Sequence, residues 1–365
     1  MKIVNADAIL VSIPFQPIGI PPWSWGDKAE NCFDTLLVRI ETDTGIVGWG
    51  EAFSRNKDRA LAETIRTKIL PLVIGKEASA IGRIKHDLEF NLHNFGRVSG
   101  VMNGISAVDI ALWDILGKSV NRPLVDLIGG AFADTLPAYA SLLRYADETH
   151  LGDAIEQAIG RGYRYIKLHE IDPGLIRFAV NLGAGRARFM LDTNCPWPVS
   201  EAIRQAKSLS DVDLIWFEEP VWPPENYSGL AQVRAAGPFP IAAGENQGSL
   251  FDIAAMIAAG AIDIAQPDVA KTGGVTELLR IRALCEAAGV DFVPHCALFG
   301  PGQVATFHIN AATRSMPVVE RLYCDFDEDL YGGRANPVAG NIRVPTGPGL
   351  GLDPDPAIVE KYRVR

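Results

Sequence analysis

Residues 214–245 begin with the run Leu214-Ile215-Trp216-Phe217-Glu218 and end with Ile241-Ala242-Ala243-Gly244-Glu245. Both runs are short and apolar, both end in a glutamate, and the residues between them suffice for one helix. Seven such runs follow one another along the chain, and they end at Lys167, Asp192, Glu218, Glu245, Asp268, His295 and Glu320, at intervals of 25, 26, 27, 23, 27 and 25 residues. A strand-plus-helix unit repeating at this interval indicates a parallel sheet built from βα units.

A further strand is expected near residues 136–140, which makes eight units in about 200 residues. This number predicts an α/β fold with a TIM-type (β/α) barrel, at residues 131–334, rather than an open sheet. In such a barrel the strand ends converge on one rim, where active sites are built. One charged residue at a strand end is usually the solvated start of a loop. Seven ionisable residues at the ends of seven successive predicted strands are not explained in that way.

The first 130 residues have a different pattern. Residues 35–41 and 46–51 are two β-rich runs around the turn Thr42-Asp43-Thr44-Gly45, which predicts a hairpin. Farther on, apolar residues recur at helical spacing, at Ile105, Val108, Leu112 and Ile115. Strands followed by helices predict a separate α+β domain over residues 1–130.

Two features of this domain are candidates for substrate binding. A Pro/Gly-rich loop at residues 18–26 carries Trp23 and Trp25, which could form a lid that stacks on a ligand or seals the site, or could anchor the loop to the core. Arg55 follows the hairpin, and it is equally compatible with a surface arginine and with a group that binds a distal carboxylate or hydroxyls of a ligand.

Composition excludes several classes of function. The 365 residues are 48% hydrophobic and 21% charged, which is typical of a globular protein. The net charge of −10 argues against binding to nucleic acid or to an anionic membrane surface. Five cysteines without Cys-x-x-Cys spacing predict neither a disulfide framework nor a zinc ribbon. Because the sequence shows no pattern typical of a signal peptide or of a membrane-spanning helix, we expect a soluble, cytoplasmic protein.

Three carboxylates end consecutive predicted strands: Asp192, Glu218 and Glu245. Converging carboxylates repel one another and need a cation between them. A set of oxygen ligands without Cys or His selects a hard ion such as Mg²⁺. The alternative is three surface acids near helix N-termini, where acidic residues are common.

Base candidates lie on both sides of these carboxylates. Lys167 and His169 are two residues apart on one strand and so point to the same face. Asp268 and His295 end neighbouring strands, where a carboxylate beside an imidazole supports acid–base chemistry. Taken singly, Lys167 could close a barrel salt bridge and His295 could be a core histidine. Together with a metal, they fit abstraction of a proton α to a carboxylate.

Motifs along nearly the whole chain resemble the enolase superfamily, and within it the mandelate racemase-like subgroup. They are VRIETDTGIVGWGE (38–51), AVDIALWD (107–114), WFEEP (216–220), GEN (244–246), QPDVAKTGG (266–274) and GPGLG (347–351). The resemblance implies a modified barrel and a capping domain made of residues 1–130, to which residues 335–365 return. Muconate-lactonising-type relatives carry a lysine at the position of Asp268, which disfavours that subgroup.

The resemblance also implies residue roles. Mg²⁺ is expected on Asp192, Glu218 and Glu245, with Glu219 and Asn194 behind these ligands. Asp268 and His295 match the His-Asp dyad of the subgroup, and Glu320 matches the acid that hydrogen-bonds the enediolate. The family's Lys-x-Lys becomes Lys167-Leu168-His169 here, so His169 could be a base, a general acid or a hydroxyl-binding group.

The leading hypothesis is therefore Mg²⁺-dependent dehydration of a sugar acid to a 2-keto-3-deoxy acid. The alternatives are a cycloisomerase acting on a sugar-acid lactone or anhydro sugar acid, a racemase or epimerase of a 2-hydroxy acid, and a non-catalytic ligand-binding barrel. The expected partner is a small-molecule carboxylate, and the resemblance implies a homo-oligomer.

Overall fold

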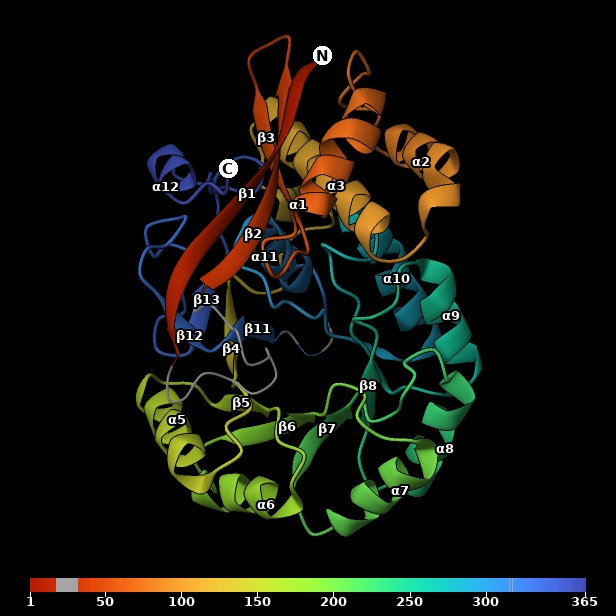
Figure 1. Ribbon diagram of the computed structural model, residues 1–365, viewed down its shortest axis with the longest axis vertical. Coiled ribbons are helices and arrows are strands. Elements are labelled where there is room, and N and C mark those ends of the chain that lie inside the picture. The colour runs from red at the N-terminus through yellow and green to blue at the C-terminus, as the bar shows by residue number, and fades with distance from the viewer. Residues whose placement is uncertain (18–31, 315, 317) are drawn as a thin grey trace.

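Two β-sheets organise the molecule, which we describe from a computed structural model covering residues 1–17, 32–314, 316 and 318–365 (Figure 1). The smaller sheet is antiparallel and has the strand order β12 (Cys324–Phe326), β1 (Ile3–Pro17), β2 (Cys32–Thr42) and β3 (Val47–Ala52). The predicted hairpin is confirmed, because β2 and β3 pair on either side of the turn that ends at Gly45.

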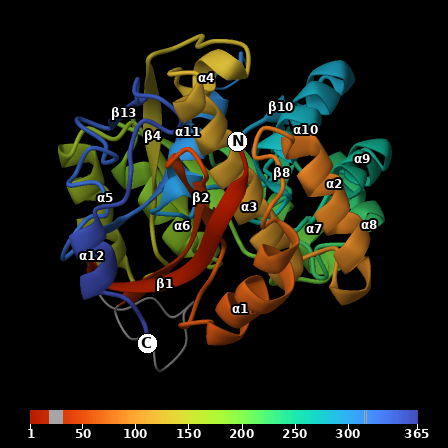
Figure 2. The ribbon, with the colours of Figure 1, turned by 90° about the horizontal axis from the view of Figure 1, so that it is seen from above.

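Helices cover one face of this small sheet. They are α1 (Arg59–Thr64), α2 (Ile81–Leu92) and α3 (Gly100–Ser119), with short turns at Ile65–Ile69, Leu70–Leu72 and His93–Phe95, and with α4 (Leu124–Leu127) leading to the larger sheet. Figure 2 views this part of the molecule from above, with β1 and β2 beside α3. We refer to the small sheet and α1–α3 as the cap.

The cap depends on a close approach between β3 and α3. A Cβ atom on Gly48 would lie 2.3 Å from the Ala111 carbonyl oxygen, and one on Gly50 would lie 1.8 Å from the Ala107 carbonyl oxygen. Only glycine therefore allows the strand to lie this close to the helix. By length and composition α3 is the one described helix that could span a membrane, but 83% of its apolar window is buried inside the fold, so protein already covers its apolar side chains.

The larger sheet contains eight parallel strands. In spatial order they are β11 (Val319–Leu322), β4 (Thr135–Ser141), β5 (Tyr165–Leu168), β6 (Arg188–Asp192), β7 (Leu214–Glu218), β8 (Ile241–Ala243), β9 (Ile264–Ala265) and β10 (Asp291–Phe292). The helices between them are α5 (Glu148–Gly160), α6 (Pro173–Leu182), α7 (Val199–Ser208), α8 (Tyr227–Ala236), α9 (Leu250–Ala258), α10 (Gly274–Ala288) and α11 (Pro301–Ala311).

This arrangement confirms the predicted modified barrel. The modification lies at its last unit, because β11 is followed by β12, which joins the cap sheet, instead of by an eighth helix. In the described residues, no ladder joins β10 to β11. The barrel interior is packed by an apolar cluster that includes Tyr139, Met190 and Trp216. The polar residues at the strand ends therefore lie above an apolar barrel interior.

The C-terminal tail contacts both parts of the molecule. Strand β13 (Asn341–Arg343) pairs antiparallel with β4, at the end opposite the rim. After α12 (Pro356–Lys361), the backbone returns to β1, where Ser12 N–H donates to Tyr362 C=O at 3.0 Å and Val364 N–H to Leu10 C=O at 2.8 Å. Both chain ends accordingly lie on the cap side of the molecule (Figure 1).

One buried glutamate joins the cap to the rim. Glu51, at the end of β3, accepts hydrogen bonds from Gly300 N–H at 3.1 Å and from Gly302 N–H at 2.9 Å, at the N-terminus of α11. Burial raises the pKa of Glu51 to about 7, although these backbone donors oppose the shift. The end of the predicted hairpin is thus held directly against the barrel.

The contact between β3 and α3 predicts the effect of adding one methyl group. Gly50→Ala should lower the free energy of unfolding by about 3 kcal/mol or more, because the new Cβ meets backbone that cannot move aside. Gly82→Ala, on an exposed position of α2 with open space around it, is the matched control and should be neutral or stabilise by about 0.5–1 kcal/mol. Urea denaturation measures both variants, and equal stabilities would contradict the packing argument.

Candidate active site

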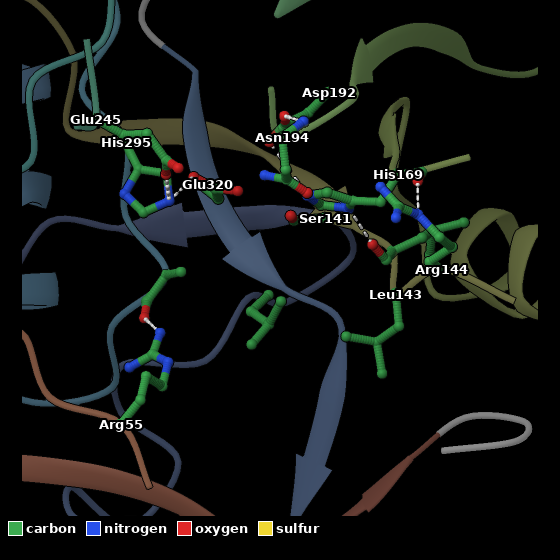
Figure 3. Close-up of a pocket in the computed structure, with 13 residues that line it drawn as sticks. Arg55, Ser141, Leu143, Arg144, His169, Asp192, Asn194, Glu245, His295 and Glu320 are labelled. Atoms are coloured by element: carbon green, nitrogen blue, oxygen red, sulfur yellow. Dashed lines mark hydrogen bonds and ion pairs between the residues drawn. The ribbon is translucent and has the colours of Figure 1, made fainter. Parts of the chain in front are cut away.

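A cavity of about 420 Å³ lies at the rim of the barrel, between the strand ends and the cap (Figure 3). Its walls come from the C-terminal ends of the barrel strands and from Arg55 of the cap. The volume lies in the range of small-molecule sites. All five cysteines are free, as predicted, so no disulfide shapes this cavity.

Lys167 is the central cation of the site. Its side chain is only 1% exposed, and Nζ lies 3.1 Å from Asp192 Oδ2, 3.1 Å from Glu218 Oε1 and 2.9 Å from Glu320 Oε1. Asp192 and Glu218 end β6 and β7 as predicted, whereas Glu320 is the second residue of β11 and not its last, because this strand continues to Leu322. One ammonium thus faces three carboxylates away from water.

Burial and neighbouring charges shift the pKa values of this cluster in different directions. Burial disfavours the charged form of Lys167, but the surrounding carboxylates outweigh burial and raise its pKa well above the ordinary value. Burial also opposes ionisation of Asp192 and Glu320, yet Lys167 holds the pKa of Asp192 below its usual range and that of Glu320 at about 2. Burial and the charge of Asp192 raise the pKa of Glu218 to about 8. One ammonium therefore faces three buried carboxyl groups whose pKa values lie far apart.

His295 lies between two carboxylates on the other side of the cavity. Its Nδ1 is 2.6 Å from Asp268 Oδ2 and its Nε2 is 2.6 Å from Glu245 Oε2. Burial lowers the pKa of His295, but Glu245, Glu320 and Asp268 together raise it well above the ordinary value. The Ala270 N–H donates to Asp268 Oδ1 at 2.7 Å, which fixes the carboxylate that orients the imidazole. The two predicted dyad residues therefore make direct contact.

His169 lies near Asp192, across the cavity from His295 (Figure 3). Its Nδ1 contacts the Leu142 carbonyl oxygen, which only accepts hydrogen bonds, so Nδ1 carries a proton. Its Nε2 lies 3.2 Å from Asp192 Oδ2 and borders the cavity. The two imidazoles thus present their Nε2 atoms from different walls of one cavity.

Glu218 and Glu219 are adjacent in sequence but face different surroundings. Glu218 Oε2 accepts from Trp216 Nε1 at 2.8 Å and from Gln266 Nε2 at 3.1 Å, which holds the carboxylate toward Lys167. Glu219 has a left-handed backbone, with φ of 44°, and accepts from Asn246 Nδ2 at 2.8 Å. The structure therefore places Glu219 behind the carboxylate cluster.

The remaining predicted residues have different outcomes. Asn194 lines the cavity, and its N–H donates to Asp192 Oδ1 at 2.9 Å. Arg55 also lines the cavity, so it is not a plain surface arginine. Trp23 and Trp25 lie outside the described residues.

Sequence reasoning missed three polar residues of the site: Ser141, Arg144 and Gln266. Gln266 precedes Asp268 by two residues near the end of β9, a spacing that could have indicated a shared face. Ser141 is the last residue of β4 and lies opposite Lys167 in the β4–β5 register. Arg144 follows β4 in a loop, and no pattern in the sequence indicates it.

The donor set fits a divalent metal ion of the Mg²⁺ kind. Asp192, Glu218 and Glu245 supply only oxygen atoms, which are the ligands that a hard divalent ion prefers. As the side chains stand, no three acidic, His or Cys groups in the described part of the chain are close enough to hold a metal. Glu245 is turned to His295, and Asp192 to Lys167 and His169, so binding a metal would need small side-chain rotations.

Two family models match this chain. "Enolase C-terminal domain-like" matches residues 150–358, and "Mandelate racemase / muconate lactonizing enzyme, N-terminal domain" matches residues 27–129. The first match covers more than half of the chain and contains the predicted metal and dyad residues.

Curated relatives of similar length include two kinds of sugar-acid enzyme. D-galactarolactone cycloisomerase of Agrobacterium fabrum is 30% identical, over 90% of this chain and 91% of its own length. D-galactonate dehydratase of Verminephrobacter eiseniae is 31% identical, over 89% of this chain and 90% of its own length. Among solved structures, a racemase from Streptomyces coelicolor with bound magnesium superposes with a TM-score of 0.88 at 27% identity, covering 99% of this chain and 100% of that one.

The central ammonium predicts a pH-dependent loss of stability when it is removed. Lys167→Met should lower the free energy of unfolding by about 3–5 kcal/mol at pH 8, because buried carboxylates lose their counter-charge. Without Lys167, burial and mutual repulsion raise the pKa values of the three carboxyl groups. At pH 5 these groups become protonated, which removes the buried charge, so the loss in free energy of unfolding should be smaller than at pH 8.

Denaturant unfolding at the two pH values tests this prediction. Lys361→Met removes an exposed lysine paired with Glu328 and should change stability by less than about 1 kcal/mol at either pH. A loss for Lys167→Met that is the same at pH 8 and pH 5 would contradict the electrostatic explanation.

Proposed function

This chain belongs to the mandelate racemase/muconate lactonizing enzyme family of the enolase superfamily, and we propose that it removes the proton α to the carboxylate of a sugar acid with the help of Mg²⁺. It is a lyase or isomerase of this superfamily. The observation that carries the proposal is one cavity that two imidazoles and three carboxylates line, with the buried Lys167 in contact with two of those carboxylates.

Asp192, Glu218 and Glu245 would hold the metal ion, because they are the buried oxygen donors at three consecutive strand ends. When bound, Mg²⁺ supplies positive charge that stabilises the negative charge developing on the substrate carboxylate. Lys167 supplies a second positive charge for the same carboxylate. Glu320 lies 2.9 Å from Lys167 and accepts from Cys296 N–H at 2.9 Å, which holds it beside the position proposed for the substrate carboxylate.

His295 is the proposed base. Asp268 holds its Nδ1 as a donor, which leaves Nε2 as the atom that accepts the α-proton once Glu245 no longer occupies it. The α-proton moves to Nε2 while the electron pair of the C–H bond moves into the enediolate. Asp268, 2.6 Å from Nδ1, stabilises the imidazolium that results.

His169 is the proposed acid for elimination. The enediolate expels the β-hydroxyl, which leaves as water when His169, as an imidazolium with protons on both nitrogens, donates its Nε2 proton to it. The product is an enol that tautomerises to a 2-keto-3-deoxy acid, so one water is lost overall. Because the two imidazoles lie on different walls of the cavity, the proton and the hydroxyl depart toward different side chains.

Cycloisomerisation is a second candidate, because D-galactarolactone cycloisomerase matches nearly the whole chain at an identity similar to that of D-galactonate dehydratase. The first step is the same. The group that leaves from the β-carbon is then a ring oxygen of the substrate instead of a hydroxyl, so the ring opens and no water is released. The two reactions require the same side chains.

Exchange of the α-proton tests the shared first step. In D₂O with Mg²⁺, sugar acids and their lactones should incorporate deuterium at the α-carbon or yield keto acid, and His295→Asn should slow this by about 1,000-fold or more. His86→Asn, on an exposed position of α2, should leave the rate unchanged. Wild-type activity in His295→Asn would remove the proposed base.

The products separate the candidates. Keto acid formed from an open-chain acid supports dehydration, and keto acid formed only from a lactone or an anhydro acid supports cycloisomerisation. Deuterium incorporation with inversion and no keto acid would overturn both in favour of racemisation.

The raised pKa of Glu218 predicts that Mg²⁺ binding releases a proton. At pH 7 Glu218 is mostly protonated, because its pKa is about 8, and a ligand carboxylate must be ionised. Mg²⁺ affinity should therefore rise with pH up to about 8 and level off above it. Calorimetric titration in buffers of different ionisation enthalpy measures the released protons at pH 7 and pH 9.5. Equal proton release at both pH values would show that Glu218 is not the coupled group.

A further inference from the structure

We infer that Arg144 binds a second carboxylate at the far end of the substrate, which makes the substrate a sugar diacid or its monolactone. The inference rests on the proposed function, because it takes the reacting carboxylate to lie at Lys167. It names a specificity-determining residue that the sequence did not indicate.

Arg144 is a cation with an available hydrogen-bonding edge. Its Nε donates to the His169 carbonyl oxygen at 2.5 Å, and its Nη2 makes a long contact of 3.4 Å to the Thr193 carbonyl oxygen. Nη1 has no hydrogen-bond partner in the described part of the chain, and Arg144 forms no ion pair there. Since the side chain borders the cavity, the edge formed by Nη1 and Nη2 is available to a ligand.

The neighbouring acid Glu170 does not take up this charge. Glu170 lies close enough for Arg144 to lower its pKa, although burial raises that pKa overall. Its oxygens accept from the backbone N–H groups of Tyr145 and Ala146 instead. A planar guanidinium with two parallel N–H groups matches a carboxylate better than it matches single hydroxyls.

Arg55, the other arginine of the cavity, is already held by the protein. Its Nη1 donates to the Ser54 carbonyl oxygen at 2.8 Å and its Nη2 to the Ala297 carbonyl oxygen at 2.7 Å. Its guanidinium lies over the rings of Phe33 and Phe53, at 4.1 and 4.4 Å from their centroids. Burial lowers the pKa of Arg55 to about 10, and Glu51 and Asp268 are the charges that oppose this shift. Arg55 is therefore a structural cation between cap and barrel.

The position of Arg144 along the chain suits a distal group. It lies three residues beyond Ser141, whose register partner is Lys167, so its Cα is at most about 10 Å farther along the strand direction. Lys167 lies behind Asp192 and Glu320, which line the cavity, and Arg144 is on the wall next to His169 (Figure 3). An extended sugar acid bound at Lys167 would thus point its other end toward Arg144.

Equilibrium binding tests the inference independently of turnover. In a His295→Asn background with Mg²⁺, calorimetry compares a six-carbon sugar diacid with the monoacid of the same configuration. Arg144→Met should weaken diacid binding about 100-fold, because one partner of a desolvated charge pair is lost, and monoacid binding less than threefold. Arg144→Lys should recover part of the diacid affinity, since it keeps the charge and loses the planar fork.

Arg186→Met removes an exposed arginine paired with Glu156 and serves as the control, with no change for either ligand. Equal weakening of both ligands by Arg144→Met would overturn the inference. The inference would also be overturned if Arg55→Met lost the preference for the diacid while Arg144→Met kept that preference. The wild-type enzyme is assayed in parallel for α-proton exchange. If no exchange occurs but Arg144→Met still weakens diacid binding as expected, the proposed function is contradicted and the inference about Arg144 is not.

Discussion

The buried ammonium of Lys167 is the interaction on which the site depends. Three carboxylates on three different strands face it within 3.1 Å, and all three are almost completely buried. Such a cluster is costly unless its charges are balanced. The barrel supports it with an apolar base beneath and with fixed donors, such as Trp216 and Gln266, that hold the carboxylates in place.

The cap completes this environment. Glu51 is the link, because it lies at the end of the β2–β3 hairpin and caps the N-terminus of α11 through Gly300 and Gly302. The same hairpin can reach the barrel only because Gly48 and Gly50 let it lie against α3. A backbone contact inside the cap therefore helps to position the strand that carries Glu51.

Much of the fold and of the candidate site could be predicted from periodicity. Strand ends such as Asp192 and Glu218 recur at the spacing of βα units, and parallel strands bring their ends to one rim. The hairpin was predictable from its turn, and α3 from its apolar spacing. Arg144 could not be predicted, because a loop arginine has no period and its importance comes from the carbonyls that orient it and from the cavity it borders.

The sequence by itself therefore determined the barrel, the cap hairpin and the set of acidic and basic side chains at the rim, because these follow from local spacing. Only the tertiary structure decided which charges meet. It placed Lys167 among Asp192, Glu218 and Glu320, turned Glu219 away from its neighbour Glu218, and held Arg55 by protein groups while leaving an edge of Arg144 open. The physical reason is that pairing and desolvation depend on distances between strands and loops, which no single stretch of sequence contains.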